Sequence, residues 1–359
     1  MIDVDIVLER KHFDVVINQQ FKNGITGIFG QSGSGKTSLL QALAGLASPR
    51  RGRIVAGDKV LFDSEQHIHI PVEKRNVGYV FQEGRLFPHM SVERNLRYGI
   101  KKNRDIGVSF DEVVEMLNLG PLLKSRPSHI SGGERQRTAL GRSLLSSPDM
   151  LFLDEPFSAV DMQLRDQILP FILKIQRTFT FPILVVSHDL PDLLKLTDTL
   201  CLIKEGRCVG HGEYYSLLKS KTSASVIGTR AYINAIEMRV SGHDTSTGLT
   251  ILCRQSNEQN VCVKCNSKKV NAVSGQLVRV FVAADDISLS FQSLQNVTIQ
   301  NQLEGKIVDL IERDGVFLCA VDVGFRLLVE ITRESVRQLQ IEPGRKVWCL
   351  FKTVAIQAC

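Results

Sequence analysis

At 359 residues the chain is longer than a single hydrophobic core usually supports, so we expect two domains. Hydrophobic residues make up 43% of it and charged residues 23%, a balance that excludes a largely disordered protein. The formal net charge of +6 is modest. The basic residues form short, scattered clusters without interleaved aromatics, which favours solvated surface over a face that binds nucleic acid.

The N-terminal segment alternates Ile2, Val4, Ile6 and Leu8 with acidic residues, and this period of two predicts a strand. No apolar run reaches the length of about 18 residues that a membrane-crossing helix needs. No signal peptide precedes the strand. We therefore expect a chain without a membrane span.

A glycine-rich segment follows the apolar run 25–29 and precedes a helical pattern at 38–43. Its residues are Gly30, Gln31, Ser32, Gly33, Ser34, Gly35, Lys36, Thr37 and Ser38. Strand, loop and helix occur in the order that a P-loop requires. The glycines would let backbone N–H groups converge on phosphates, while Lys36 adds a charge and Thr37 offers a hydroxyl to Mg²⁺. This segment predicts a nucleotide site.

The apolar run 77–81 ends at Gln82, whose amide could cap a turn or bind Mg²⁺ and water. Helical patterning follows, for example over 110–117, and predicts a helical region at about 83–147. Within that region, Ile130, Ser131, Gly132, Gly133 and Glu134 precede a helix expected over 135–145. The free N–H groups at such a helix start suit a phosphate. An ordinary capping box of Ser131 with Glu134 is the alternative.

Two further strands end in polar side chains. The run 151–153 leads to Asp154 and Glu155, and the run 183–186 leads to His188. Because parallel strands bind ligands at their carboxyl ends, Asp154 can hold Mg²⁺ from the side opposite Thr37. Glu155 could then orient or deprotonate an attacking water. His188 could contact the γ-phosphate.

Together these segments resemble an ATP-binding-cassette (ABC) ATPase over roughly residues 1–230. The matches occur in the family's order: 30–37 resembles the Walker A loop, Gln82 the Q-loop, 131–134 the signature, 151–155 the Walker B strand, 158–161 the D-loop and His188 the switch histidine. The signature departs from the family pattern at two positions. Ile130 replaces leucine and Glu134 replaces glutamine, and both glycines are kept.

The resemblance implies a RecA-like P-loop α/β domain over 1–230 with ATP and Mg²⁺ as cofactors. Thr37, Gln82 and Asp154 would hold the metal, and Glu155 would be the general base, assisted by His188 and Gln82. It also implies a head-to-tail homodimer in which Ser131, Gly132, Gly133 and Glu134 bind the partner's nucleotide and Asp161 lies in the D-loop. The aromatic that stacks on adenine stays open between His12 and Phe13.

After about residue 230 the pattern changes to short alternating strands separated by turns, at 277–282, 316–321 and 347–351. They predict a small all-β, OB-like domain over 231–359. A unit at about 294–359 resembles the Mop/TOBE module of molybdate-handling proteins, through the segments 297–307, 331–335 and 351–354. Gln300 stands where these modules commonly carry arginine, which removes a cation where an oxyanion would be held. Two roles for this domain stay open: molybdate sensing, or a β-barrel that only stabilises the dimer or damps transport.

All eight cysteines lie in the C-terminal half, and reduced cytoplasmic thiols are expected. Cys262 and Cys265 have the spacing of a metal or redox pair. No second pair completes a tetrahedral site around them. We therefore favour a structural role for both.

The segments 23–26, 84–89 and 95–99 also resemble the ATPase subunits of molybdate importers. The expected function is an ATPase, peripheral to the cytoplasmic side of a bacterial inner membrane, that energises molybdate or tungstate uptake. It would dock on a separate permease through Gln82 and the segment 83–89, and serve a periplasmic oxyanion-binding protein indirectly. The same ATPase could serve sulfate, iron, sugar or polyamine. A soluble ABC ATPase acting on nucleic acid or ribosomes, and a purely regulatory oxyanion-binding protein, are more remote alternatives.

Overall fold

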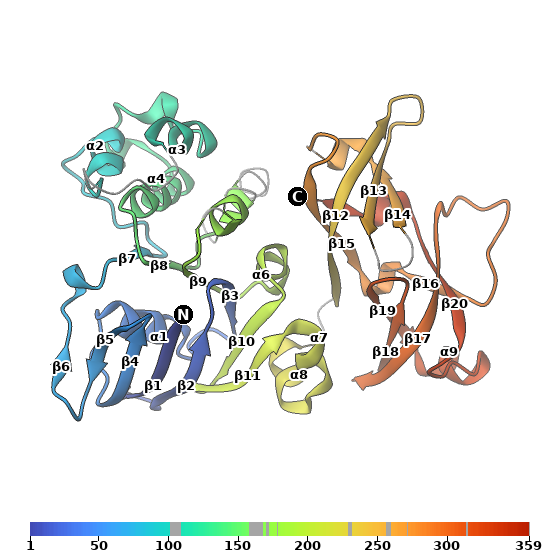
Figure 1. Ribbon diagram of the computed structural model, residues 1–359, viewed down its shortest axis with the longest axis horizontal. Coiled ribbons are helices and arrows are strands. Elements are labelled where there is room, and N and C mark those ends of the chain that lie inside the picture. Colours follow the sequence, from blue (N-terminus) through green and yellow to red (C-terminus); the bar gives the residue numbers. More distant parts are fainter. Residues whose placement is uncertain are drawn as a thin grey trace. The chain divides into compact units, whose positions relative to one another are not determined.

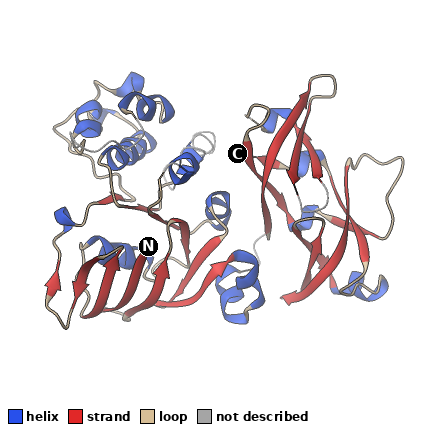
Figure 2. Cartoon of the chain, viewed as in Figure 1, coloured by secondary structure: helices blue, strands red, loops and turns tan. Residues whose placement is uncertain are grey.

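The computed structural model describes residues 1–100, 109–157, 168–169, 172–177, 179–228, 232–255, 260–270, 272–313 and 315–358. The chain divides into two compact units, Met1–Ile227 and Gly228–Cys359. Figures 1 and 2 show a first unit of mixed helices and strands and a second built mostly of strands. No helix in the described residues is both long enough and apolar enough to cross a membrane.

One mixed sheet organises the first unit, with eleven strands within the described residues, in the order β6-β5-β4-β1-β2-β11-β10-β3-β9-β8-β7. The strands are β1 (Ile2–Leu8), β2 (Val15–Phe21), β3 (Gly24–Phe29), β4 (Arg51–Ala56), β5 (Lys59–Asp63), β6 (Ile68–His69), β7 (Val77–Val80), β8 (Met150–Asp154), β9 (Pro182–Ser187), β10 (Thr199–Lys204) and β11 (Arg207–Glu213). In β1, buried and exposed positions alternate, as its sequence predicts.

The strands β3, β9, β8 and β7 pair in parallel, so their carboxyl ends meet at one edge of the sheet. β8 and β9 are buried along their whole length. This burial explains their continuous apolar sequences, because both faces of a parallel sheet are covered. Polar residues appear only where these two strands end, and that edge is the place where ligands bind in such sheets.

The helices of the first unit are α1 (Lys36–Ala44), α2 (Val92–Arg97), α3 (Phe110–Met116), α4 (Gly132–Leu145), α6 (Leu190–Leu196), α7 (Tyr214–Lys219) and α8 (Lys221–Ile227), with 3-10 turns η1 (Val72–Lys74), η2 (Gly120–Leu122) and η3 (Pro127–His129). Figure 1 shows α2, α3 and α4 grouped in a lobe of their own. Gly141 of α4 is needed there, because a Cβ would lie 2.8 Å from the Leu96 side chain.

Arg75 anchors the end of α1 that is remote from the glycine-rich loop. Its side chain is only 2% exposed. Its guanidinium donates to the carbonyls of Ala42 at 3.0 Å and Leu43 at 2.9 Å, and to Ile70 at 2.8 Å. The last carbonyls of a helix have no partner within it, and a cation at that end also complements the helix dipole. Arg75 therefore fixes α1 against η1 and the strands beside it.

The second unit contains two five-stranded antiparallel sheets within its described residues, ordered β14-β13-β12-β15-β21 and β16-β20-β17-β18-β19. Its elements are β12 (Ile233–Asp244), β13 (Leu249–Gln255), β14 (Asn260–Asn266), η4 (Ser267–Lys269), β15 (Leu277–Ala283), η5 (Ala284–Asp286), β16 (Ser288–Ser290), β17 (Asn301–Arg313), β18 (Val316–Asp322), β19 (Arg326–Thr332), α9 (Arg333–Gln338), β20 (Lys346–Phe351), η6 (Thr353–Ala355) and β21 (Gln357–Ala358). Both sheets contribute to one hydrophobic core. The all-β prediction is confirmed.

The expectation of reduced thiols is wrong for two of the cysteines. Cys253 on β13 and Cys262 on β14 lie directly opposite each other and form a disulfide. Cys262 and Cys265 are not bonded, because residues three apart on a strand point to opposite faces. Cys262 is exposed on its face, whereas Cys265 is buried as a free thiol. The cross-strand register, which spacing along the chain does not reveal, decides the pairing.

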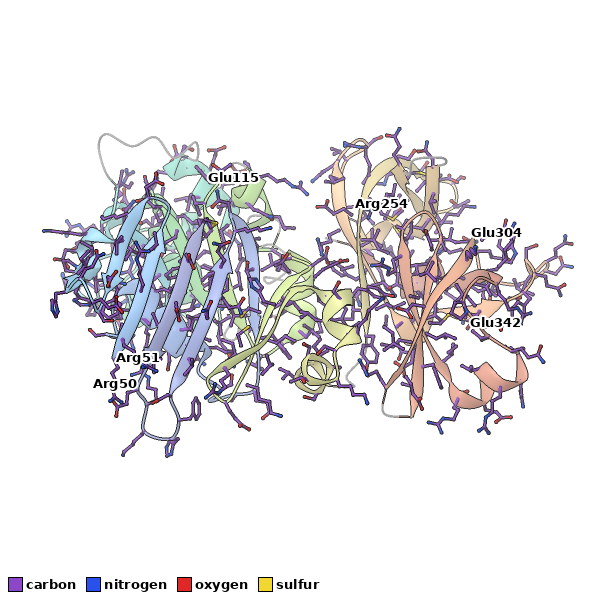
Figure 3. The ribbon with its side chains drawn as sticks, turned by 60° about the horizontal axis from the view of Figure 1, so that its bottom comes forward. Arg50, Arg51, Glu115, Arg254, Glu304 and Glu342 are labelled. Carbon is purple, nitrogen blue, oxygen red and sulfur yellow. A yellow bond between two sulfur atoms is a disulfide. The ribbon has the colours of Figure 1, made fainter. Side chains whose placement is uncertain are left out.

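The basic cluster at 50–53 lies on the surface. Arg50 and Arg51, at the start of β4, point away from the sheet (Figure 3). The Arg50 guanidinium is 4.0 Å from the carboxylate of Glu9, and both side chains are exposed. This arrangement agrees with the interpretation of the cluster as solvated surface.

Candidate nucleotide-binding and hydrolysis site

The glycine-rich loop joins β3 to α1 and is shaped by its glycines. Gly33 and Gly35 have φ of 79° and 105°, in the left-handed region that favours glycine. A Cβ on Gly30 would lie 2.1 Å from the Ile203 carbonyl oxygen, so no larger residue fits there. Around Gly33, in contrast, a Cβ would meet nothing within 4 Å. The loop is therefore packed tightly at its base and open at its tip.

Lys36 lies inside the curl of this loop. Its Nζ donates to the carbonyl oxygens of Gly30 at 2.8 Å and Gln31 at 2.9 Å, and only 5% of the residue is exposed. Burial lowers the pKa of Lys36, and the charges of Glu155 and Asp154 oppose that shift. The sequence motif thus places its cation at the centre of the loop and near two carboxylates.

The loop fits a phosphate group. The Ser34 hydroxyl is buried and has no hydrogen-bond partner within the described residues, which is unusual for a buried polar atom. It lies where the backbone N–H groups at the start of α1 are also free of helical partners. An unsatisfied donor beside a helix start and a lysine is the environment that phosphate oxygens require.

Thr37 and Asp154 meet across the site from α1 and β8. The Thr37 hydroxyl donates to Asp154 Oδ1 at 3.0 Å, and Asp154 is 4% exposed. Burial raises the pKa of Asp154, while the hydrogen bonds from Thr37 and Tyr79 oppose that rise. A hydroxyl and a carboxylate in contact provide the oxygen ligands that Mg²⁺ prefers. The pair therefore fits the metal role expected for it.

Sequence reasoning missed Tyr79. This residue lies on β7, and its hydroxyl donates to Asp154 Oδ2 at 3.1 Å. Burial and the neighbouring Asp154 raise the pKa of Tyr79, so the phenol stays protonated and able to donate. Only the strand register brings Tyr79 near Asp154, because β7 pairs in parallel with β8, the strand that ends at Asp154.

Glu155 and His188 meet at the ends of β8 and β9. Glu155 has φ of 50°, a left-handed conformation that costs a non-glycine residue about 1 kcal/mol and is common at functional sites. Its backbone N–H donates to the Val186 carbonyl at 3.0 Å. His188 Nδ1 lies 2.7 Å from Glu155 Oε2. The strained backbone turns the Glu155 side chain toward the histidine.

The signature segment forms a complete capping box at the start of α4. The Ser131 hydroxyl accepts from the Glu134 N–H at 3.3 Å, and Glu134 Oε2 accepts from the Ser131 N–H at 2.7 Å. The Ser131 N–H lowers the pKa of Glu134. The capping interpretation is therefore correct as local geometry. It leaves the N–H groups of Gly132 and Gly133 without helical partners.

The structure groups some predicted residues and separates others. Lys36, Thr37, Asp154, Glu155 and His188 lie at one edge of the sheet, whereas no hydrogen bond within the described residues joins the signature to that group. Gln82 lies in an exposed turn after β7, where its side chain makes no hydrogen bond to another described residue. The D-loop prediction, including Asp161, lies outside the described residues.

The two candidates for the adenine-stacking aromatic differ in their surroundings. Phe13 packs against the hydrophobic core and lies so close to Gly206 that a Cβ there would be 2.7 Å from its ring. Gly206 in turn donates its N–H to the Ser34 carbonyl of the glycine-rich loop at 2.9 Å. His12 is exposed. Phe13 thus supports the loop from its core side, and His12 is the more accessible ring.

Comparison with known proteins agrees with this geometry. Residues 17–158 match the family described as ABC transporter, and residues 298–358 match the TOBE domain. The chain is 38% identical to the molybdenum import ATP-binding protein ModC of Rhodospirillum rubrum, covering 99% of this chain and 97% of that protein. It is 36% identical to ModC of Escherichia coli K12, covering 94% of each.

Among solved structures, the dimeric ATP-binding cassette MJ0796 bound to ADP and Pi is similar with a TM-score of 0.51 and 21% identity, covering 59% of this chain and 98% of that one. At this identity the likeness concerns the fold alone. The much higher identity to the ModC proteins extends over nearly the whole chain. The chain belongs to the ModC family of ABC transporter ATP-binding proteins.

Proposed function

We propose that this chain is the ATP-hydrolysing subunit of an importer that drives molybdate uptake through a separate membrane permease. One observation carries the choice of cargo. Similarity to molybdenum import proteins spans both units: the protein of Rhodospirillum rubrum covers 99% of this chain and that of Escherichia coli K12 covers 94%. The MJ0796 cassette covers only 59% of it. The second unit is therefore part of the similarity. A generic cassette match would have left the cargo undefined.

The first unit supplies the chemistry. Phosphates of ATP would lie against the N–H groups and the Ser34 hydroxyl of the loop 30–38, with Lys36 neutralising charge on the β- and γ-phosphates. Thr37 and Asp154 would hold Mg²⁺, with Gln82 as a further ligand. When bound, the metal supplies charge neutralisation at the phosphates.

Glu155 accepts the proton of the attacking water in this scheme. His188 Nδ1 lies 2.7 Å from Glu155 Oε2, and this contact orients the carboxylate. Holding a base in one orientation matters because proton transfer requires hydrogen-bond distance to the nucleophile. His188 also lies at the strand end where it could contact the γ-phosphate. These roles make Glu155 the catalytic base and His188 its orienting partner.

Two copies would form the working unit. The signature residues Ser131, Gly132 and Gly133 would bind the γ-phosphate held by the partner, and the free N–H groups at the start of α4 support this role. The D-loop with Asp161 would lie at the same interface. ATP would then hold the two copies together, and hydrolysis would release them.

The permease is expected to dock on the segment 83–89, at the cytoplasmic face of a bacterial inner membrane. Hydrogen bonds connect that segment to α2 and α4 of the helical lobe. Phe87 exchanges two hydrogen bonds with Asn95, at 2.9 and 3.1 Å, and Arg142 donates to the Arg85 carbonyl at 2.8 Å. A force on this segment would therefore reach α2 and α4. A periplasmic oxyanion-binding protein would act on the complex only through the permease.

Uptake in living cells tests the cargo. The gene is expressed in a bacterial strain that lacks its own molybdate-import ATPase but keeps the permease, and uptake of labelled molybdate is followed at low external concentration. We expect uptake with the wild-type chain and none with Glu155→Gln. A second strain lacks its sulfate-import ATPase. Restored sulfate transport in that strain, without molybdate uptake in the first, would assign the chain to the alternative cargo.

Molybdate binding by the second unit is a separate proposal with its own test. Gln300 is exposed before β17, where an arginine would add a cation. Calorimetric titration of the full chain with molybdate, tungstate and sulfate measures binding directly. Selective binding that Gln300→Arg tightens supports a sensing site. An absence of binding in both proteins assigns the unit to a structural role.

A further inference from the structure

The Asp154 carboxylate is held at both of its oxygens by residues from two different elements. Thr37, at the start of α1, donates to Oδ1 at 3.0 Å, and Tyr79 on β7 donates to Oδ2 at 3.1 Å. The terminal torsion of an aspartate is otherwise broad, so a single hydrogen bond would leave the plane of the carboxylate loosely defined. With two donors on opposite oxygens, that plane is fixed.

Tyr79 also touches the segment that follows β7. Its ring lies 4.2 Å from that of Phe81, centroid to centroid, at an interplanar angle of 31°. The Arg85 guanidinium lies over the Phe81 ring, 4.3 Å from its centroid. Such contacts between rings, and between a cation and a ring, are favourable and directional. A continuous stack therefore runs from the carboxylate to the segment 83–89.

The backbone of Tyr79 makes a third connection. Its carbonyl oxygen accepts a hydrogen bond from the Ser143 hydroxyl of α4 at 3.1 Å. The helix α4 begins at the signature, and its Arg142 donates to the Arg85 carbonyl. Tyr79 thus lies where the carboxylate, the segment 83–89 and the signature helix meet.

We propose that Tyr79 is a positioning residue that orients Asp154 for Mg²⁺ and, through Phe81, makes metal binding sensitive to the position of the segment 83–89. This inference rests on the proposed role of Thr37 and Asp154 as metal ligands. Tyr79 does not touch the metal in this scheme. It acts on the carboxylate that does.

The test uses Tyr79→Phe, which keeps the ring and its stack and removes only the donor. Binding of a fluorescent ATP analogue to the full chain is measured first in EDTA and then as a function of Mg²⁺ concentration. We expect unchanged affinity in EDTA and an about tenfold higher Mg²⁺ concentration for half-maximal binding, as for the loss of one hydrogen bond to a charged group. Tyr215→Phe removes a tyrosine hydroxyl from α7 and is expected to match the wild type.

Two further variants separate the possible failures. Asp154→Asn should abolish the Mg²⁺ dependence; if wild-type binding does not depend on Mg²⁺ at all, the metal assignment itself is wrong. If wild type and Asp154→Asn behave as expected but Tyr79→Phe matches the wild type, only the role of Tyr79 is overturned.

Phe81→Leu keeps the Tyr79 hydroxyl and breaks the ring stack. A severalfold rise in the Mg²⁺ requirement supports the link to the segment 83–89, and an unchanged requirement overturns that link.

Discussion

His188 Nδ1 and Glu155 Oε2 lie 2.7 Å apart, and this contact joins the ends of two neighbouring parallel strands. Glu155 is mostly buried, with its side chain 14% exposed, whereas that of His188 is 59% exposed. The histidine therefore reaches from the open side of the site to hold a carboxylate that is largely enclosed. Its removal should leave the Glu155 carboxylate in the site without this contact.

His188→Ala is accordingly expected to lower kcat for ATP hydrolysis by roughly 10²-fold, with little change in KM for ATP. The loss falls on kcat because the histidine orients the base and adds little to nucleotide affinity. Steady-state phosphate release measures both constants. His67→Ala, an exposed histidine on the β5–β6 turn, is the matched control. A large rise in KM with unchanged kcat would show that His188 serves binding instead.

Two matching capping boxes allow the signature to be tested apart from helix stability. Ser131 with Glu134 caps α4, and Ser109 with Glu112 caps α3 in the same way. Either serine changed to alanine should cost about 1 kcal/mol of stability. Only Ser131→Ala should also reduce ATP hydrolysis, by roughly 10²-fold, because it would remove the proposed contact to the transferred phosphate. Equal ATPase rates in the two variants would show that the signature segment acts only as a helix cap.

Arg75 should matter for stability far more than any surface arginine. Arg75→Met removes the guanidinium donor from the buried Leu43 carbonyl and leaves Ala42 with only the Gly45 N–H, at an expected cost of about 3 kcal/mol. For a unit of this size that lowers the melting temperature by roughly 6–12 °C, measurable by calorimetry. Arg51→Met, at an exposed position on β4, should change it by no more than about 1–2 °C. Similar melting temperatures for the two variants would contradict the anchoring role of Arg75.

The free thiols are expected to differ in reactivity. A hydrogen bond from the Cys201 thiol lowers the pKa of Cys208, whereas burial raises the pKa of Cys319 and of Cys349 to about 12. Because the thiolate is the reactive form, Cys208 gains reactivity at a lower pH than an ordinary cysteine. Iodoacetamide at pH 8 followed by peptide mass spectrometry should find Cys208 modified and Cys319 and Cys349 intact. Modification of all three at equal rates would contradict this order.

The sequence predicted which residues meet at one edge of the sheet, because neighbouring parallel strands bring the residues that follow them to the same edge. Asp154 and His188 each follow a buried apolar run, and the ends of such runs meet at one edge of the sheet. Lys36 and Thr37 could be placed for the same reason, since the glycine-rich loop must join a strand to a helix. These predictions needed only the type of each element.

Other features depend on register, which the sequence does not contain. Tyr79 reaches Asp154 because β7 pairs with β8, although the two residues are 75 positions apart in the sequence. Cys253 bonds to Cys262 because the two strands place them opposite each other. The sequence led us to expect reduced thiols, and nothing in the spacing along the chain indicated this bond. The capping box at Ser131 shows a third limit, since the same local geometry is compatible with a helix cap and with the proposed phosphate site.

The most direct test of a shared, ATP-closed site is Glu155→Gln, with Glu115→Gln on the exposed side of α3 as its control. Phosphate release and molecular mass by light scattering are measured with and without saturating ATP. We predict that Glu155→Gln loses roughly 10²–10⁴-fold in turnover and becomes a stable dimer only with ATP, while the control behaves as wild type. Wild-type turnover in Glu155→Gln, or a monomer at saturating ATP, would contradict the account.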